Sequence, residues 1–327
     1  MSSFKYNNVY IKDYHTIVGP KEKEGLVKFN DYIKDYYYEE PTIEDAEIKM
    51  QEHVLNKIMI NNKLVPNKID LICGGDLTNQ ISMTSYNLVN KNLPFLGLYN
   101  ACATFNESLI VLANFIESKM IETGIAITSS HNLNAERQFR YPIEYGFNKK
   151  PYSTFTTTGA AGCLLTSKRT NLKIESSTIG TVVDYGILDA SNMGAVMAPS
   201  AAATLHKHLT ELNRPLSYYD LIVTGDLGSY GSKLFINLIK QDYNYMPSAY
   251  FDAASTIYDN ESLGVEGGSG PVVIPLILFN KILKETNYKR ILLLATGSLH
   301  SPLMVNLKKS IPAITHAVSI EVIKWHT

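Results

Sequence analysis

The alternation of apolar and polar positions along the chain predicts strands and helices that follow one another in turn. Short apolar runs with the length of strands lie at 68–73, 95–99, 125–128, 161–165, 220–223, 291–295 and 317–323. Helical spacing of apolar residues marks 43–61, 105–120, 198–212, 232–239 and 271–283. Residues 1–40 are polar and show no clear pattern. Strands that alternate with helices predict mostly parallel sheets joined by right-handed crossovers.

One junction in this pattern carries a candidate functional residue. The stretch from Pro94 to Glu107 is interpreted as a buried strand that runs directly into a helix, with Cys102 at the turn between them. Backbone N–H groups and the helix dipole at such a position favour an anion and lower a thiol pKa. Cys102 is therefore either a nucleophile or anion-binding point, or a buried and inert cysteine.

Two segments recur in the same order and suggest a duplication. The run Asp70–Leu77 (DLICGGDL) shares six of its eight residues with Asp220–Leu227 (DLIVTGDL), and Ile125–His131 resembles Leu293–His300. Two copies are too few for a solenoid. We therefore expect two similar α/β halves, residues 1–168 and 169–327, packed as one body.

Several polar residues come directly after predicted strands, where ligands bind in parallel sheets. They are Asp76, Cys102, His131, Asp226 and His300. Alternatives remain: Asp76 and Asp226 also suit helix N-caps, and His131 suits a structural role.

Composition excludes some classes of function. Apolar residues make up 45% of the 327 positions and charged residues 19%, as in globular proteins, and the net charge of −1 gives no reason to expect a nucleic-acid partner. Cys73, Cys102 and Cys163 are read as reduced thiols. The N-terminus is polar and the longest apolar run, near 271–279, is too short for a membrane span, so we expect a soluble chain.

The motifs of common cofactor and metal sites are missing from the sequence. There is no GxGxxG, Walker loop, HExxH or paired-cysteine motif. His206 and His208 are two positions apart on a predicted helix and do not share a face. We therefore predict no cofactor and no metal site.

A family resemblance covers residues 75–319. It rests on the motifs Gly75–Gln80, Pro94–Cys102, Ser129–His131, Ala135–Pro142, Glu144–Gly146, Thr158–Ala160, Met193–Pro199, Thr224–Gly228 and Ile311–Ser319. With these motifs the chain resembles the stage V sporulation protein AD family, a branch of the thiolase-like superfamily. The resemblance implies an α/β fold of two duplicated halves in five layers, α/β/α/β/α, with the helices after Cys102 and Pro271 in the centre.

The resemblance also bears on catalysis. Enzymes of the superfamily combine the cysteine with a histidine and an asparagine, or with two histidines, in the second half, and thiolases add a second cysteine. At the matching places this chain has Asp226 and the turn Gly267–Gly270, and no cysteine follows Cys163. A nucleophilic cysteine needs a base and oxyanion donors. We therefore expect a protein that is not an enzyme.

The family implies that the ligand is dipicolinic acid, free or as its calcium chelate, and that it is moved into the developing spore. Arg137 and Arg140 are candidate donors to its carboxylates, or else structural partners of Glu136 or Glu144. Phe139 and Tyr141 are candidate walls for its flat ring.

The predicted ligand site consists of Cys102, His131, Arg137, Arg140, Asp226 and His300. The implied partners are the other stage V A proteins, with the chain peripherally associated with the spore inner membrane, and the fold also allows a homodimer. Two alternatives stay open: an acyltransferase that uses Cys102, and a docking subunit without a ligand.

Overall fold

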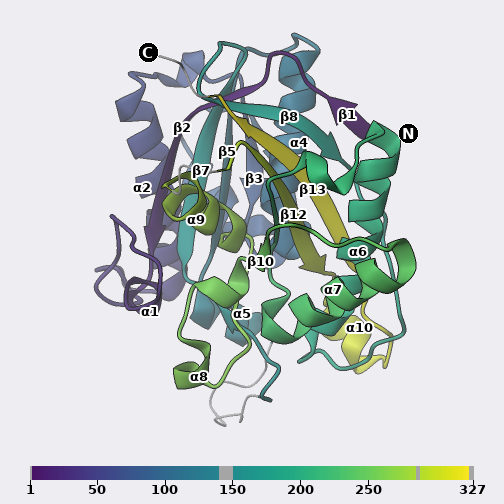
Figure 1. Ribbon diagram of the computed structural model, residues 1–327. Coiled ribbons are helices and arrows are strands. Elements are labelled where there is room, and N and C mark those ends of the chain that lie inside the picture. Colours follow the sequence, from purple (N-terminus) through teal and green to yellow (C-terminus); the bar gives the residue numbers. More distant parts are fainter. Residues whose placement is uncertain (1, 140–149, 285–287, 324–327) are drawn as a thin grey trace.

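The computed structural model describes residues 2–139, 150–284 and 288–323, and most of its strands belong to one large mixed sheet (Figure 1). This 11-stranded sheet has the order β10-β9-β12-β13-β8-β2-β7-β5-β3-β4, and β1 pairs with β8. Its strands are β1 (Ser3–Lys5), β2 (Tyr10–Val18), β3 (Leu71–Gly75), β4 (Phe95–Gly97), β5 (Thr123–Ser130), β7 (Gly159–Thr166), β8 (Leu172–Thr178), β9 (Leu221–Thr224), β10 (Tyr250–Asp252), β12 (Arg290–Ser298) and β13 (Ala313–Val322). Two short strands, β6 (Phe155–Thr156) and β11 (Gly268–Ser269), form a separate parallel pair.

The strand order divides into two runs with the same topology. In the first run β2, β7 and β5 are successively antiparallel, and β3 and β4 then continue parallel to β5. In the second run β8, β13, β12, β9 and β10 repeat this order and these directions. The expected duplication is thus present in the fold, and the division expected at residues 168 and 169 falls between β7 and β8.

Matching hydrogen bonds support the duplication. Asp70 accepts the N–H groups of Glu122 and Thr123 at the start of β5, both at 2.9 Å. Asp220 accepts the N–H groups of the two residues at the start of β12 in the same way, both at 2.8 Å. The repeated aspartates therefore tie the same neighbouring strands together in both halves.

The helices lie in three layers around the two runs of strands. They are α1 (Pro20–Lys23), α2 (Ile43–Asn61), α3 (Ser82–Leu88), α4 (Thr104–Glu117), α5 (Asn132–Phe139), α6 (Met193–Leu212), α7 (Gly228–Tyr243), α8 (Asn260–Leu263), α9 (Val273–Asn280) and α10 (Pro302–Asn306). Figure 1 shows α2 and α6 on opposite sides of the molecule. Both are amphipathic and pack on strands, α2 on β2, β5 and β7, and α6 on β12 and β13.

The central layer is formed by α4 and α9, as expected. Their side chains share one apolar core with both runs of strands. Phe105 of α4 and Phe279 of α9 meet edge to face with ring centroids 6.2 Å apart, and Phe279 stacks on Tyr14 of β2 at 4.3 Å. Both phenylalanines are fully buried, so this contact locks the two halves together.

The prediction of a mostly parallel sheet was wrong, because β2, β7, β5 and β8, β13, β12 pair antiparallel. Three further expectations about single elements were also wrong. Residues 10–18 form β2, a strand inside the sheet, although their polar residues hid it. The strand β4 before Cys102 is a short edge strand with half-buried and exposed residues and is not buried. The helix predicted to begin at residue 198 is α6, which already begins at Met193. Pro199 therefore lies inside the helix and not in its first turn.

Candidate functional site

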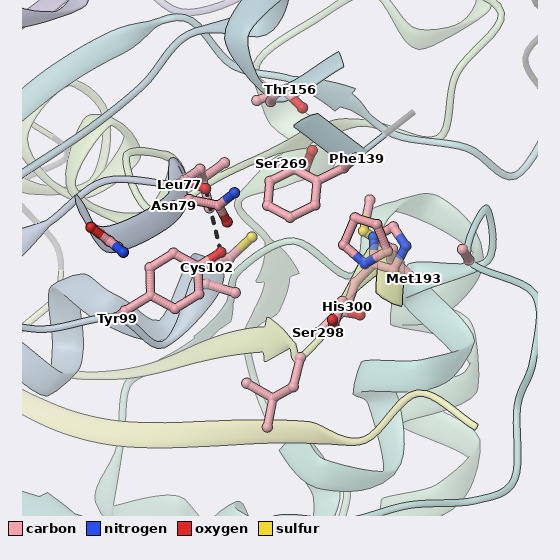
Figure 2. A pocket seen from close by; sticks show the side chains of 17 residues that line it. Leu77, Asn79, Tyr99, Cys102, Phe139, Thr156, Met193, Ser269, Ser298 and His300 are labelled. Carbon is pink, nitrogen blue, oxygen red and sulfur yellow. Dashed lines mark hydrogen bonds between the residues drawn. The ribbon is translucent and has the colours of Figure 1, made fainter. Parts of the chain in front are cut away.

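A cavity of about 300 Å³ lies between the two halves, at the carboxyl ends of the strands β3 and β12 (Figure 2). The first half contributes residues after β3, the turn before α4 and the helix α5. The second half contributes the start of α6 and the segment that follows β12. The lining residues are Leu77, Asn79, Gln80, Tyr99, Ala101, Cys102, Ala135, Phe139, Thr156, Ala190, Met193, Ser269, Ser298, Leu299, His300, Ser301 and Pro302.

Cys102 lies in this cavity wall, in a short 3₁₀ turn (Ala101–Ala103) that leads into α4. Its neighbour Ala101 has a left-handed backbone, with φ 49°, which is unusual for a residue other than glycine. The strand β12 passes so close that a Cβ at Gly297 would lie 2.5 Å from the carbonyl oxygen of Asn100. The local fold therefore holds the thiol in place from both halves.

The carboxyl group of Asp226 lies against this thiol. Asp226 is fully buried, has φ 66°, and accepts the Gly270 N–H through Oδ1 at 2.6 Å. Burial and the carboxyl of Asp226 raise the pKa of the Cys102 thiol well above its ordinary range. Burial, followed by the negative charge of Asp252, likewise raises the pKa of Asp226. The electrostatics at Cys102 therefore oppose the thiolate that a nucleophile requires.

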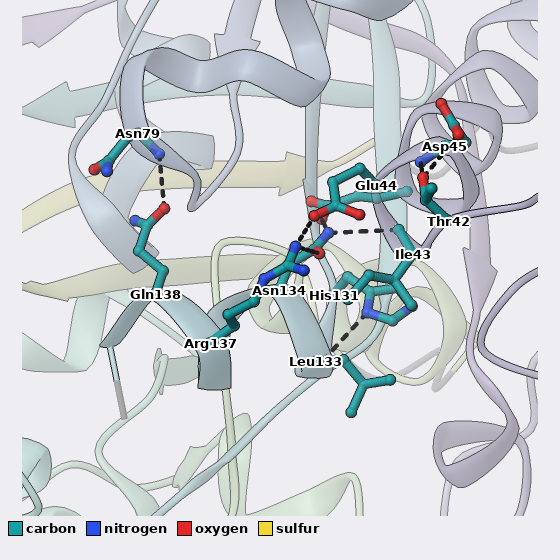
Figure 3. A network of polar contacts seen from close by, with 11 residues as sticks. Thr42, Ile43, Glu44, Asp45, Asn79, His131, Leu133, Asn134, Arg137 and Gln138 are labelled. Carbon is teal, nitrogen blue, oxygen red and sulfur yellow. Dashed lines mark hydrogen bonds and ion pairs between the residues drawn. The ribbon is translucent and has the colours of Figure 1, made fainter. Parts of the chain in front are cut away.

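His131 is not part of the cavity wall, although it directly follows β5. Its Nε2 pairs with the carbonyl oxygen of Tyr36 at 2.9 Å, and its Nδ1 accepts the Leu133 N–H at 3.3 Å, as Figure 3 shows for the second contact. Burial lowers the pKa of His131 to about 4. His131 thus has the structural role that the sequence left open as an alternative.

Arg137 also lies outside the cavity lining. It forms an ion pair with Glu44 at the start of α2, and its guanidinium lies 3.5 Å from the side-chain oxygen of Asn134 (Figure 3). Glu144, one of the two partners expected from the sequence, lies outside the described residues. Arg140 lies outside the described residues, as does Tyr141.

Of the six predicted site residues, Cys102 and His300 line the cavity. Asp226 is not part of the lining, but its carboxyl contacts the thiol of Cys102. The rings of His300 and Phe139 lie 5.6 Å apart and belong to opposite halves. Phe139 was expected as a wall. Tyr99, Met193 and the serines of the wall were missed, although Ser298 and Ser301 stand in the short segment around His300.

Other predictions concern cysteines, histidines and membrane spans. Cys73, Cys102 and Cys163 form no disulfide, and all three are buried. His206 stacks on Tyr243, whereas His208 points into the fold and bonds Thr178 and Tyr219, so the two do not converge. In the part of the chain that the structure describes, no helix has the length and the apolarity that crossing a bilayer requires.

Comparison with known proteins decides the family. A model of the family described as "Stage V sporulation protein AD (SpoVAD)" matches residues 2–321. The chain belongs to the stage V sporulation protein AD family. The curated stage V sporulation protein AD of Bacillus subtilis (strain 168) is 35% identical over 318 residues, which cover 96% of this chain and 94% of that protein.

Solved structures show that the fold of this family member is thiolase-like. OleA of Xanthomonas campestris with bound cerulenin matches with a TM-score of 0.61 and 14% identity, covering 96% of this chain and all of that one. The 3-oxoacyl-[acyl-carrier-protein] synthase III of Aquifex aeolicus VF5 matches with a TM-score of 0.57 and 16% identity over 98% of both chains. These neighbours are enzymes, whereas the curated relative is named as a sporulation protein.

Proposed function

We propose that this sporulation protein binds dipicolinate, free or as its calcium chelate, in the cavity at Cys102, and that it does so without catalysing a reaction. The observation that carries the proposal is a small, two-sided cavity whose floor is a thiol that the protein keeps protonated. A volume of about 300 Å³ is at the lower end of the range for ligand clefts, which suits a single small ring. The rings of Tyr99 and Phe139 offer flat walls for such a ring.

The polar part of the lining suits carboxylates. Hydroxyl groups of Thr156, Ser269, Ser298 and Ser301 and the amides of Asn79 and Gln80 surround the space. The turn at Cys102 also brings the start of the 14-residue helix α4 to the wall, where a helix dipole favours negative charge. Each group can replace part of the hydration that a carboxylate loses on binding.

The charge of the lining bears on the form of the ligand. Among the described residues of the wall there is no lysine, arginine, aspartate or glutamate. A free dianion prefers fixed cations, whereas the 1:1 calcium chelate of dipicolinate has no net charge. Calcium also accepts hydroxyl and amide oxygens as ligands. These considerations favour the calcium chelate as the form that binds.

The same site argues against the acyltransferase alternative. A catalytic cysteine needs a neighbouring base and a lowered pKa. The thiol of Cys102 instead lies beside the buried carboxyl of Asp226, and burial and this carboxyl both raise the thiol pKa. We include in the proposal that the protein acts with the other stage V A proteins, peripherally at the spore inner membrane, to move dipicolinate into the developing spore.

Isothermal titration calorimetry tests the proposal. The full chain is titrated with dipicolinate in the presence and in the absence of Ca²⁺, and with benzoate, which has one carboxylate and no ring nitrogen, as the matched control. We expect saturable binding of one dipicolinate per chain, tighter with Ca²⁺, and no saturation with benzoate. Absence of dipicolinate binding, or equal binding of benzoate, would contradict the proposal and leave a docking role.

A further inference from the structure

Three side chains from three separate segments meet on the first half, away from the cavity lining. His15 lies on β2, His53 on α2, and Asp31 in the segment between α1 and α2. The Nε2 atoms of His15 and His53 lie 2.7 and 3.0 Å from the same oxygen of Asp31, Oδ2. One ligand atom from each residue lies within 4.8 Å of the other two.

The fold fixes all three positions. Val18 of β2 donates its N–H to the carbonyl of Asp31 at 3.1 Å, and its carbonyl accepts the N–H of Ile33 at 2.9 Å. These two bonds fasten the loop to the strand on both sides of Tyr32. His53 precedes Val54, which is fully buried where α2 packs on the sheet. The cluster therefore rests on a strand, a helix and a loop that backbone bonds hold in place.

The three side chains are open to solvent to a limited degree. Their side-chain exposure is 20% for His15, 25% for His53 and 31% for Asp31. A small ion can therefore reach them, while their surroundings still restrain the rings. The rings of the two histidines are tilted by 42°, with centroids 5.4 Å apart.

We propose that His15, Asp31 and His53 form a binding site for a divalent transition metal ion of the zinc type. Two imidazole nitrogens and one carboxylate oxygen are a usual zinc ligand set, with bonds of about 2.0–2.2 Å and a further position left for water. Such bonds place tetrahedral ligands roughly 3.3–3.5 Å apart, so the two nitrogens need to move away from Oδ2 by roughly 0.3–0.8 Å. Calcium and magnesium prefer all-oxygen sites, so this site is separate from any calcium bound with dipicolinate.

The protonation states suit metal binding. Burial lowers the pKa of His15, which keeps the ring neutral at neutral pH, the form that ligates a metal. Burial alone would raise the pKa of Asp31, but its hydrogen bonds with the two histidines outweigh this effect and lower the pKa, so the carboxylate is ionised. The nearby cation Lys57 opposes binding.

Binding at this site would also fasten the loop to the body of the protein. The same loop carries Tyr36, whose carbonyl pairs with His131 at the start of α5. Helix α5 in turn supplies Ala135 and Phe139 to the cavity wall. A bound ion should therefore raise the melting temperature, since a ligand that binds only the folded state stabilises it.

The test uses the untagged full chain after treatment with a chelator. Zn²⁺ affinity is measured by competition with a chromophoric chelator, and Co²⁺ is added to record the absorption of a tetrahedral site. We expect one tight site per chain and a Zn²⁺-dependent rise in melting temperature. His53→Ala and Asp31→Asn should each weaken Zn²⁺ at least about tenfold, since even outer-shell changes cost 10–100-fold.

His206→Ala is the matched control, because it removes a half-buried histidine from α6, outside this cluster. It should leave Zn²⁺ binding unchanged. Asp31→Asn keeps the size of the side chain, so it remains informative if His53→Ala unfolds. The proposal is overturned if the parent does not bind Zn²⁺ at tens of micromolar, or if folded His53→Ala and Asp31→Asn bind it like the parent; the three residues then form a hydrogen-bonded cluster only.

Discussion

Asp76 and Asp226 follow equivalent strands in the two halves, but only Asp226 faces Cys102. Asp76 accepts the N–H groups of Thr78 at 2.9 Å and Thr84 at 2.8 Å, and so satisfies the first turn of α3. In the second half the matching task falls to Asp252, which accepts the N–H groups at the start of α7. Asp226 therefore does not cap α7, and its carboxyl accepts the Gly270 N–H beside Cys102.

The first prediction concerns this pair. Asp226→Asn removes the carboxyl that raises the pKa of the Cys102 thiol, so Cys102 should react at lower pH. The measurement is the rate of Cys102 alkylation by iodoacetamide against pH, followed by mass spectrometry of its peptide. The midpoint of this profile should shift down but stay above that of an ordinary thiol, because the variant loses the carboxyl and keeps the burial that is the larger cause of the raised pKa.

Cys73 and Cys163 serve as internal controls for this experiment. Both are fully buried, and burial raises the pKa of Cys73 to about 12. Their peptides should react slowly in the parent and in the variant alike. An unchanged Cys102 profile in a folded Asp226→Asn protein would show that the carboxyl does not control the thiol.

The second prediction concerns acyl transfer. If the protein binds its ligand without catalysis, as we propose, incubation with acetyl-coenzyme A should release no coenzyme A above the buffer rate and should leave no stable acyl group on Cys102, because burial and the carboxyl of Asp226 keep the thiol protonated. Intact-mass spectrometry and a thiol-release assay check this. A Cys102 adduct that disappears in Cys102→Ser, together with turnover, would favour the acyltransferase alternative.

How much of this site could be foreseen depends on the residue. The rule that ligands bind at strand carboxyl ends correctly placed Cys102 and His300 in one cavity, because the repeated motif fixed the matching strands. The rule does not say which way a side chain points after the strand. His131 turns away because the carbonyl of Tyr36 pairs with its ring, and that loop carries no readable pattern.

Long-range contacts account for the other misses. Residues 10–18 look polar because Lys12, Asp13 and His15 interrupt the apolar positions, yet β2 pairs with β7 and β8 and lies inside the sheet. From the sequence, Arg137 was expected to pair with a glutamate close to it in the chain, whereas in the structure it pairs with Glu44 of α2. The cluster of His15, Asp31 and His53 is invisible in sequence for the same reason.

The third prediction concerns the cavity. Cys102→Trp should abolish dipicolinate binding, because the indole would fill much of a cavity of about 300 Å³, whereas Cys102→Ala should change affinity little. Circular dichroism confirms that each variant is folded, and calorimetry measures its affinity. Binding by folded Cys102→Trp at the parental affinity would place the ligand elsewhere.

The two candidate arginines form a matched pair for the same assay. Arg137→Ala should leave binding unchanged, because Arg137 pairs with Glu44 and does not line the cavity. Arg140→Ala tests the arginine that lies outside the described residues. If Arg140 contacts a carboxylate, as the sequence predicts, its loss should weaken binding about tenfold or more, since such contacts contribute roughly 1.5–3 kcal/mol. Weaker binding by Arg137→Ala would contradict the assignment from the structure.

The fourth prediction concerns self-association through β4. This strand is at the edge of the sheet and exposes Leu96 to 42%, with no charged residue on the strand to discourage pairing. We expect a homodimer in light scattering coupled to size exclusion. Leu96→Lys should shift it toward the monomer, and Val65→Lys, which changes an exposed apolar residue outside this strand, should not. A parent that is monomeric at tens of micromolar contradicts the prediction.

The fifth prediction concerns stability against pH. Glu22 is fully buried, and its Oε1 accepts the Thr158 N–H at 2.9 Å and the Tyr258 hydroxyl. Burial raises the pKa of Glu22 from 4.5 to about 7. Burial also raises the pKa of Asp252 to about 7 and, together with the charge of Asp76, that of Glu47 to about 8.

These shifts fix the sign of the pH dependence. Between pH 4.5 and 7 the folded protein keeps a proton on Glu22 that the unfolded chain has lost, so raising the pH favours unfolding. The stabilising contribution is complete below pH 4.5 and is lost as the pH rises through about 7. One such proton changes the free energy of unfolding by at most about 1.4 kcal/mol per pH unit.

Urea unfolding at pH 5.5, 6.5, 7.5 and 8.5 measures this slope. Below about pH 6.5 the lowered pKa values of His131, His208 and His316 give a slope of the opposite sign, because the unfolded chain then binds the protons. From pH 6.5 upward the free energy of unfolding should fall with rising pH in the parent and fall less steeply in Glu22→Gln. Glutamine retains an oxygen for Thr158 and Tyr258 and places its amide where Oε2 has no hydrogen-bond partner among the described residues. Glu24→Gln, two positions on and exposed, is the control and should keep the parental slope. If Glu22→Gln shows the parental slope as well, Glu22 is ionised in the folded protein and some other donor must satisfy its buried charge.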